Sequence, residues 1–397
     1  MLEGVNVALG VTGSIAAVKT VELAHELRRR GATVRAVMTD SARGIVHPWA
    51  LEFATETEVV TEITGRVEHV ELCGTEGWAD VYLIAPATAN TVGKIASAVD
   101  DTPVTTTATT ALGSGTPVVI APAMHEPMYD HPGVLETIAR VESWGVEFVD
   151  PRVEEGKAKI ATEEAIACAV AREAGDRPLA GEHVVITSGA TTEEIDPVRV
   201  LTNRSSGTMG REIARACYVR GADVTLVHGD VGPQPVTSDV SPAGDVPYAD
   251  VRQVESAAEM LEATTDACAD ADALVSAAAI SDYTVPARDE KIRSGADLTL
   301  EFEPTPKLID SIRKRQPELP IVGFKAETGS DDAAMVEAAR ETLARVGLAF
   351  VVANDAGVMG ATRTRGLLVH ASDVAAYEGT KAGLADEIAA SLAVVLE

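Results

Sequence analysis

The chain has 397 residues, of which 61 are acidic and 33 basic, and its formal net charge is −28. This acidic excess argues against nucleic-acid binding through the surface as a whole, because contacts to phosphates need a basic face. No apolar run approaches the roughly 20 residues of a membrane helix, and no secretory signal pattern stands at the start. We therefore expect a cytoplasmic protein that binds neither nucleic acid nor membrane.

The numbers and positions of cysteine and lysine residues indicate which metal or redox motifs are absent and in what salt the protein works. The four cysteines lie far apart without a Cys-x-x-Cys pair, which argues against a zinc cluster or a dithiol redox motif. The basic residues comprise 9 Lys and 24 Arg. Few lysines among many carboxylates is the composition of a protein kept soluble in concentrated salt, where acidic side chains repel one another less. We expect a halophilic source, in which each retained lysine is informative.

The first half alternates strand and helix patterns. A βαβ unit is predicted over residues 6–39, with its helix from residue 14. Further strands are predicted at 79–86, 117–122 and 146–150, and helices at 90–99, 132–145 and 162–175. Helices that alternate with buried strands indicate a mostly parallel sheet covered on both faces.

A Pro- and Gly-containing stretch near residue 180 separates the two halves, and the alternation then restarts. Strands are predicted at 183–191, 222–229, 273–281, 320–327 and 349–355, with a last helix from about residue 379. The sequence thus predicts an α/β protein of two doubly wound, Rossmann-like three-layer domains. Their predicted bounds are 1–178 and 179–397.

The stretch GVTGSIAAVK, residues 10–19, joins the first strand to a helix through Gly10 and Gly13, with Ser14 at the expected N-cap. Glycines permit close backbone approach, and a helix N-terminus offers free N–H groups to a phosphate. The spacing is not G-x-G-x-x-G, and the next strand runs into AVMTDSA rather than ending in the acidic residue that would hold a dinucleotide ribose. A mononucleotide such as FMN fits better than NAD, and a merely tight turn is the alternative.

Two histidines are candidates for chemistry. His69 stands two residues before Glu71, and in an extended segment the two would share a face. His125 follows the strand at 117–122, within APAMHEPMY. Each is either a structural or surface histidine or a group that delivers a proton or a hydrogen bond to a pocket.

Four stretches together resemble a family: GVTGSIAAVK, HVELCGTEGWAD, APATANTVGKIA and APAMHEPMY. They resemble the flavin-dependent cysteine decarboxylases, specifically the 4′-phosphopantothenoylcysteine decarboxylase half of bifunctional coenzyme A biosynthesis enzymes. The resemblance implies a flavodoxin-like flavoprotein domain with His69 as the catalytic histidine. It also implies that FMN contacts Gly13, Ser14, Ile15, Thr39, Thr88, Thr105 and Thr107.

The resemblance also implies how decarboxylation proceeds, and the sequence departs from the family pattern at two places. The flavin oxidises the thiol-bearing carbon, CO₂ leaves, and the reduced flavin returns the electrons, so that no external oxidant is consumed. His125 stands where bacterial members carry an Asn that holds the substrate carboxylate. Lys157 and Lys159 stand in the flap, where bacterial members carry a Cys. We expect these lysines either to donate a proton or to hold the substrate phosphate.

In the second half, DPVRVLTNRSSGTMG, SAAAISDYTV, EKIRSG, PTPKLID and VGFKAET resemble phosphopantothenate–cysteine ligase. The resemblance implies that CTP with Mg²⁺ activates a carboxylate as an acyl-cytidylate, which the cysteine amine then attacks. It implies catalytic roles for Asn203 and Lys291. The implied nucleotide contacts are Ser276, Ala277, Ala278, Asp282, Lys291, Thr305, Pro306, Lys307, Leu308 and Phe324.

We therefore predict an enzyme that condenses 4′-phosphopantothenate with cysteine and decarboxylates the product to 4′-phosphopantetheine. By resemblance it is a homo-oligomer built from trimers. The alternatives are another FMN flavoprotein, an electron carrier or a different decarboxylase, fused to a nucleotide-binding domain, and a non-enzymatic regulatory subunit. The latter would have lost Asn203 and Lys291, which this chain retains.

Overall fold

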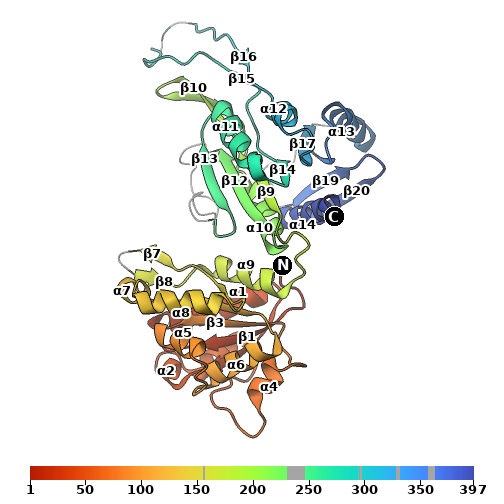
Figure 1. Cartoon of the computed structure of the whole chain (residues 1–397). Helices are drawn as coiled ribbons and strands as arrows, with labels where there is room; N and C mark the ends of the chain where they lie inside the picture. Colours follow the sequence, from red (N-terminus) through yellow and green to blue (C-terminus); the bar gives the residue numbers. More distant parts are fainter. Residues whose placement is uncertain (155–156, 230–245, 294, 296, 328–330, 356–362) are drawn as a thin grey trace. The chain divides into compact units, whose positions relative to one another are not determined.

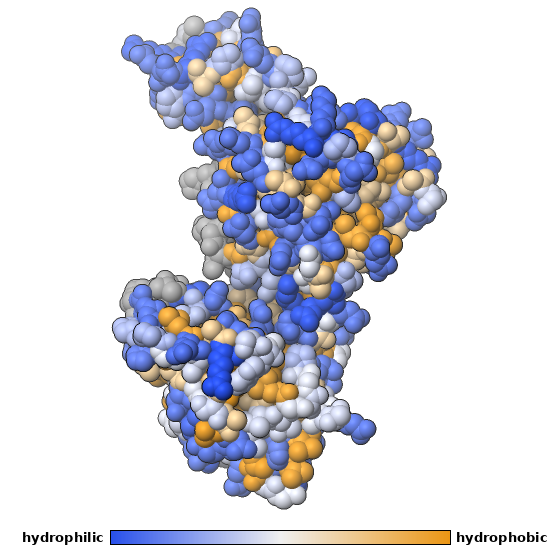
Figure 2. Space-filling view, in the orientation of Figure 1, coloured by the Kyte–Doolittle hydropathy of each residue, from blue (hydrophilic) through white to orange (hydrophobic). Residues whose placement is uncertain are grey.

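The computed structural model describes residues 1–154, 157–229, 246–293, 295, 297–327, 331–355 and 363–397 (Figure 1). The chain divides into two compact units, Met1–Asp176 and Arg177–Glu397. Hydrophilic residues predominate on the face of each unit that Figure 2 shows, in agreement with the acidic composition. In the described part of the chain, no helix combines the length and apolarity that crossing a membrane requires.

The first unit is built on a five-stranded parallel sheet of order β2-β1-β3-β4-β6. Its strands are almost wholly buried, as parallel strands covered on both faces are. Because β2 and β3 lie on opposite sides of β1, the strand order reverses there, and a crevice is expected at the carboxyl edge. The strands are β1 (Asn6–Val11), β2 (Thr33–Met38), β3 (Val81–Ala87), β4 (Val118–Pro122) and β6 (Glu147–Phe148).

Helices cover this sheet in two groups. Helix α1 packs against α3 and α9, whereas α6 packs against α4 and α5, and α5 against α8. The result is the three-layer arrangement that the alternating pattern predicts. The helices are η1 (Ile15–Lys19), α1 (Thr20–Arg29), α2 (Asp40–Arg43), α3 (Pro48–Thr55), α4 (Glu68–Cys73), α5 (Ala89–Ala96), α6 (Pro103–Ser114), α7 (Glu126–Tyr129), α8 (Pro132–Glu142) and α9 (Glu163–Ala174).

A small antiparallel sheet of order β5-β8-β7 lies in the same unit. It consists of β5 (Met124–His125), β7 (Arg152–Glu154) and β8 (Lys157–Lys159), and its register sets His125 opposite Lys157. This sheet joins the turn after β4 to the stretch predicted as a flap.

The second unit holds an eight-stranded mixed sheet of order β13-β12-β9-β14-β17-β18-β19-β20. Six strands are parallel, and β19 and β20 add an antiparallel edge. The strands are β9 (His183–Gly189), β12 (Asp223–Gly229), β13 (Asp250–Val254), β14 (Ala273–Ser276), β17 (Ile321–Glu327), β18 (Phe350–Asp355), β19 (Arg363–Val369) and β20 (Val374–Thr380).

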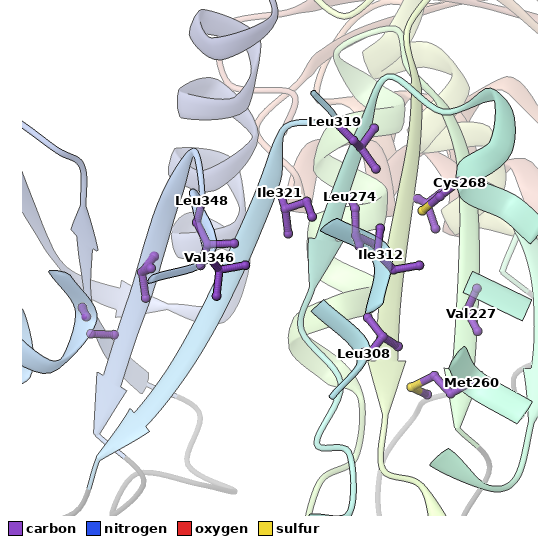
Figure 3. Close-up of a cluster of buried hydrophobic side chains, with 14 of the residues drawn as sticks. Val227, Met260, Cys268, Leu274, Leu308, Ile312, Leu319, Ile321, Val346 and Leu348 are labelled. Carbon is purple, nitrogen blue, oxygen red and sulfur yellow. The ribbon is translucent and has the colours of Figure 1, made fainter. Parts of the chain in front are cut away.

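One face of this sheet carries the hydrophobic cluster in Figure 3, to which Met260, Leu308, Ile312 and Val346 contribute from α11, α12 and α13. Helices α10 and α14 pack on each other, α10 contacting β9 and β12, and α14 contacting β19 and β20. The helices are α10 (Thr208–Val219), α11 (Ala257–Ala267), η2 (Cys268–Asp270), α12 (Leu308–Arg315), α13 (Asp332–Val346) and α14 (Lys381–Leu396).

Two short hairpins complete the unit. They are β10 (Thr192–Asp196) with β11 (Arg199–Thr202), and β15 (Tyr283–Thr284) with β16 (Glu303–Pro304).

Candidate functional site

A cavity of about 710 Å³ lies in the first unit, formed by the segments that follow β1, β2, β3 and β4 and by β8. Its volume falls within the roughly 300–1,000 Å³ of small-molecule sites. The lining comprises Thr12, Gly13, Ser14, Ile15, Ala16, Val18, Lys19, Thr39, Ser41, Thr88, Ala89, Asn90, Thr91, Lys94, Thr102, Thr105, Ala123, Met124, His125, Met128, Lys159 and Ile160.

Side-chain hydrogen bonds tie the loops of this cavity together. Thr12 Oγ1 donates to the Pro86 carbonyl at 2.7 Å, and Ser14 Oγ donates to the Ala123 carbonyl at 3.1 Å. The loops after β1, β3 and β4 are therefore fixed relative to one another, which preorganises the cavity for a ligand.

Gly13 is required by close packing at this loop. A Cβ built at Gly13 would lie 2.5 Å from Ser41 Oγ and 2.6 Å from Ser41 Cβ. The loop after β1 thus touches the start of α2, and this contact leaves no room for a side chain.

Hydroxyl groups make up much of the lining. Thr39 and Thr88 are the N-caps of α2 and α5, accepting hydrogen bonds from Ala42 N and Thr91 N at 3.2 Å. Thr105 forms a capping box with Thr102 at the start of α6. Helix N-termini with hydroxyl caps suit a phosphate.

Thr107, also predicted at the flavin site, is not among the lining residues. Its side chain is fully buried, and Thr107 Oγ1 donates to the Pro103 carbonyl at 2.7 Å. The structure places it in the packing of α6.

The charge of the lining is opposite to that of the protein. Lys19, Lys94 and Lys159 line the cavity together with His125, and none of the described lining residues is Asp or Glu. Three of the nine lysines are thus gathered in one cavity of a chain with net charge −28. Lys94 is bound to both carboxylate oxygens of Asp101 at 2.8 Å. A cavity with this lining favours an anionic ligand.

His125 and Lys159 lie on the same wall of the cavity, on β5 and β8. His125 is exposed and is the N-cap of α7. The side chain of Lys157, the residue opposite His125 in the register, lies outside the described part of the structure.

His69 lies elsewhere in the unit. It is part of helix α4, so the face that His69 and Glu71 would share in an extended segment does not form, because residues two apart on a helix do not share a face. Helix α4 contacts the far end of α6, where Ser114 Oγ donates to the Cys73 carbonyl at 2.6 Å. Thr105 and Ser114 are nine residues apart, or about 14 Å along the helix. His69 Nδ1 is buried and has no hydrogen-bond partner among the described residues.

In the second unit, loops from separate strands meet beside β14. Asn203 Nδ2 donates to the Ala279 carbonyl at 3.1 Å, and Ser281 N donates to Thr191 Oγ1 at 2.8 Å. Thr305 Oγ1 donates to the Ser281 carbonyl at 2.5 Å. Asn203 and Thr305 are thus bound to the same short segment after β14.

The other predicted nucleotide residues differ in their contacts. Lys307 forms an ion pair with Asp282, while Ala277 N and Ala278 N donate to the carbonyl and hydroxyl of Thr187. Leu308 belongs to the hydrophobic cluster of Figure 3, where it is only 4% exposed. The structure therefore places Leu308 in the core.

Pro306 stands between Thr305 and Lys307, while Ser276 precedes Ala277 and is paired with Gly323, the residue before Phe324. Ser276 ends β14 and is buried, Phe324 is half-buried in β17, and Lys291 is exposed. The side chains of Ser276, Phe324 and Lys291 show no hydrogen bond to Asn203, Ser281 or Thr305 in the described part of the chain.

Sequence reasoning missed Lys19, Lys94 and Ser41 in the first unit and the contacts of Asp196 in the second. The scarcity of lysine was a signal that could have identified Lys19 and Lys94. Among the residues that the structure describes, no group of three or more His, Cys, Asp or Glu side chains is arranged to hold a metal ion.

Comparisons with known proteins cover both units. A family model described as the DNA/pantothenate metabolism flavoprotein C-terminal domain matches residues 179–395, and a flavoprotein model matches residues 1–175. The coenzyme A biosynthesis bifunctional protein CoaBC of Thermococcus kodakarensis is 48% identical over 373 residues, which cover 93% of this chain and 89% of that protein. The Bacillus subtilis protein of the same name is 36% identical over 377 residues, covering 91% and 88%. The chain therefore belongs to the family of bifunctional coenzyme A biosynthesis proteins, which confirms the family that its motifs indicate.

Proposed function

We propose that this chain condenses 4′-phosphopantothenate with cysteine in its second unit, using CTP, and decarboxylates the product to 4′-phosphopantetheine in its first unit, using FMN. The observation that carries this proposal is the match of both units to one bifunctional family, combined with the acid-free, lysine-lined cavity. The decarboxylase substrate carries a phosphate and a carboxylate, and FMN carries a phosphate, so both molecules are anionic. Another flavoprotein fused to a nucleotide-binding unit would not account for the relative that matches 93% of the chain.

The cavity fits FMN in size and in its donor groups. We assign the flavin phosphate to the backbone of Gly13, Ser14 and Ile15 and to the hydroxyls of Thr39, Thr88 and Thr105. When bound, FMN supplies the reversible two-electron oxidation of the thiol-bearing carbon that makes loss of CO₂ possible. The cavity's own residues orient the substrate and exclude water.

His125 and Lys159 are assigned to the substrate on the opposite wall. A histidine in this position donates a hydrogen bond to the substrate carboxylate, and its cationic form adds charge. Lys159 either donates the proton to the product carbon or holds the substrate phosphate, and Lys157 shares this assignment.

His69 is assigned as the general base of the decarboxylase. Because α4 lies at the far end of α6 from the cavity of its own copy, this role requires a neighbouring copy of the chain. The family resemblance implies a homo-oligomer built from trimers, and exposed apolar side chains support association between copies: Ile15 is 79% exposed, Trp49 74% and Phe53 77%. A second copy would cover these side chains and bring α4 to a cavity.

In the ligase unit, a carboxylate oxygen of 4′-phosphopantothenate attacks the α-phosphorus of CTP and pyrophosphate leaves. The cysteine amine then attacks the acyl carbon, an amide bond forms, and CMP leaves. We assign Asn203 to the acyl-cytidylate, Lys291 to the transferring phosphate as a point charge, and Asp282, Thr305 and Lys307 to the nucleotide.

The remaining assignments in this unit are Ser276, Ala277, Ala278 and Phe324 near the base, the exposed Pro306 on the nucleotide loop, and Leu308, which supports that loop from the core. When bound, Mg²⁺ would neutralise the charge of the triphosphate.

We further propose that the enzyme works in the cytoplasm of a halophilic archaeon. The acidic charge supports the halophilic part, and four buried cysteines without a disulfide are compatible with a reducing compartment.

The proposal is tested by mass spectrometry of products. The purified chain, in concentrated salt, receives 4′-phosphopantothenate, cysteine, Mg²⁺ and CTP. We expect pyrophosphate, CMP and 4′-phosphopantetheine, and with His69→Asn the undecarboxylated cysteine adduct should accumulate. Absence of both the cysteine adduct and 4′-phosphopantetheine would refute the ligase assignment, and an adduct that persists in the wild-type protein would refute the decarboxylase assignment.

A further inference from the structure

The tip of the β10–β11 hairpin holds the backbone of Ile292, the residue after Lys291. Ile292 N donates to Asp196 Oδ2 at 3.0 Å, and Arg199 Nη2 donates to the Ile292 carbonyl at 3.1 Å. Both backbone polar groups of one residue are thus engaged by side chains that lie more than 90 positions earlier in the sequence. Such a two-sided contact fixes the position of the adjacent residue.

Asp196 is unusual among the carboxylates of this acidic chain, because its side chain is completely covered. A buried carboxylate must be paired and fully hydrogen-bonded. Asp196 Oδ1 accepts from Val198 N and Arg199 N at 2.8 Å, and Oδ2 is paired with the Arg199 guanidinium. Burial alone would raise the pKa of Asp196, but hydrogen bonds from the backbone N–H groups of Ile292, Val198 and Arg199 outweigh it and lower the pKa to about 2.

The contact to Ile292 goes beyond what the turn needs. An Asp that caps its own turn uses the N–H groups two and three residues later, as Oδ1 does here. The bond from Ile292 N serves a different segment, and Arg288 N reinforces it by donating to the Ile195 carbonyl at 3.1 Å. The hairpin tip therefore holds residues 288–292 as a unit.

The same hairpin is anchored at its other end beside the predicted nucleotide loop. Thr202 Oγ1 donates to the Thr191 carbonyl at 2.9 Å, and Asn203 Nδ2 donates to the Ala279 carbonyl. Arg199 and Asn203 are four residues apart, or about 13 Å in a strand. The hairpin thus spans the space between Asn203 and the Lys291 segment.

We propose that Asp196 and Arg199 form a clamp that positions Lys291 for the nucleotide phosphates. This inference rests on the proposed ligase function. The Lys291 ammonium itself is exposed and makes no ion pair with any residue that the structure describes. Its backbone is held while its charged end remains available, which is the arrangement a phosphate-binding lysine needs.

Limited trypsin digestion of the full chain tests the clamp without substrate. Trypsin cleaves the Lys291–Ile292 bond, and the protease must bind this stretch in an extended form, which requires the clamp to open. We expect Asp196→Asn and Arg199→Lys to speed cleavage after Lys291 at least about tenfold, as loss of a charged hydrogen bond allows. Cleavage after Lys314 in helix α12 should stay unchanged.

Glu194→Gln is the matched control, because Glu194 is an exposed carboxylate on the same strand. It should leave cleavage after Lys291 and the KM for CTP unchanged. Asp196→Asn should raise the KM for CTP more than it lowers kcat, since a displaced Lys291 first weakens nucleotide binding.

The outcomes separate the clamp from the proposed function. Unchanged cleavage in a folded Asp196→Asn protein would overturn the clamp, and if that variant does not fold, Arg199→Lys decides by the same measurement. If the variants are cleaved faster but CTP fails to protect wild-type Lys291 from trypsin, the clamp exists and the nucleotide assignment of Lys291 is wrong.

Discussion

Gly13→Ala is the sharpest test of how the flavin loop is built. The added methyl group would lie 2.5 Å from Ser41 Oγ and 2.6 Å from Ser41 Cβ, well inside contact distance. Overpacking of this kind costs about 1–3 kcal/mol. At 1.36 kcal/mol for each factor of ten, this is a loss of about 5- to 150-fold in the folding equilibrium. Because the clash lies in the cavity lining, FMN content should also fall.

The assay is denaturant unfolding at constant salt, combined with the flavin absorbance of the purified protein. Gly113→Ala is the control, since Gly113 is an exposed glycine in α6 with open space around its position. It should be neutral or stabilise by up to about 1 kcal/mol through helix propensity. The double variant Gly13→Ala/Ser41→Gly removes the clashing Cβ and Oγ and should recover much of the stability. A Gly13→Ala protein as stable and as flavin-rich as the wild type would refute the packing argument.

Three further predictions follow from charges in the structure. Hydrogen bonds from the hydroxyl and backbone N–H of Thr64 lower the pKa of Glu68 from 4.5 to about 2, so its contribution to stability is present above pH 4.5 and lost as pH falls toward 2. Glu68→Gln should therefore flatten the fall of stability in that window, and an equal slope in both proteins would contradict this. With a net charge of −28, melting temperature should rise with KCl from about 0.1 M to above 1 M, as the Debye length shrinks from about 10 Å to 3 Å; a salt-independent melting temperature would refute a halophilic source. Lys159→Gln should slow formation of 4′-phosphopantetheine by about 100-fold or more if Lys159 is the proton donor, with ligation and the first turnover of CO₂ release unchanged, whereas a raised KM alone would assign it to the substrate phosphate.

Sequence patterns predicted the parallel strands well because buried strands are continuous apolar runs. VYLIAPA and VVIAP are buried at every position, and their β-branched composition distinguishes them from helices. Strand β20, VAAYEGT, is exposed or half-buried along its whole length, so it shows no apolar alternation. The antiparallel edge formed by β19 and β20 was therefore missed.

The candidate site was predictable where function depends on backbone shape. Gly13, Ser14 and Thr88 stand at turns that depend only on residues nearby in the sequence, and the structure places all three at the cavity. His69 and Asp196 depend on contacts between distant segments: α4 against the end of α6, and the hairpin against Ile292. Neither contact leaves a local signal in the sequence, so neither could be predicted from the residues around His69 or Asp196.

The central claim is that one chain performs both reactions in sequence, and release of labelled CO₂ tests it most directly. Cysteine labelled with ¹³C in its carboxyl group is supplied with 4′-phosphopantothenate, Mg²⁺ and CTP to the full chain in concentrated salt. The account predicts ¹³CO₂ that appears only when all of these are present, and that His69→Asn abolishes while pyrophosphate release continues. Release of ¹³CO₂ without CTP, or pyrophosphate release by the wild-type protein without ¹³CO₂, would contradict it.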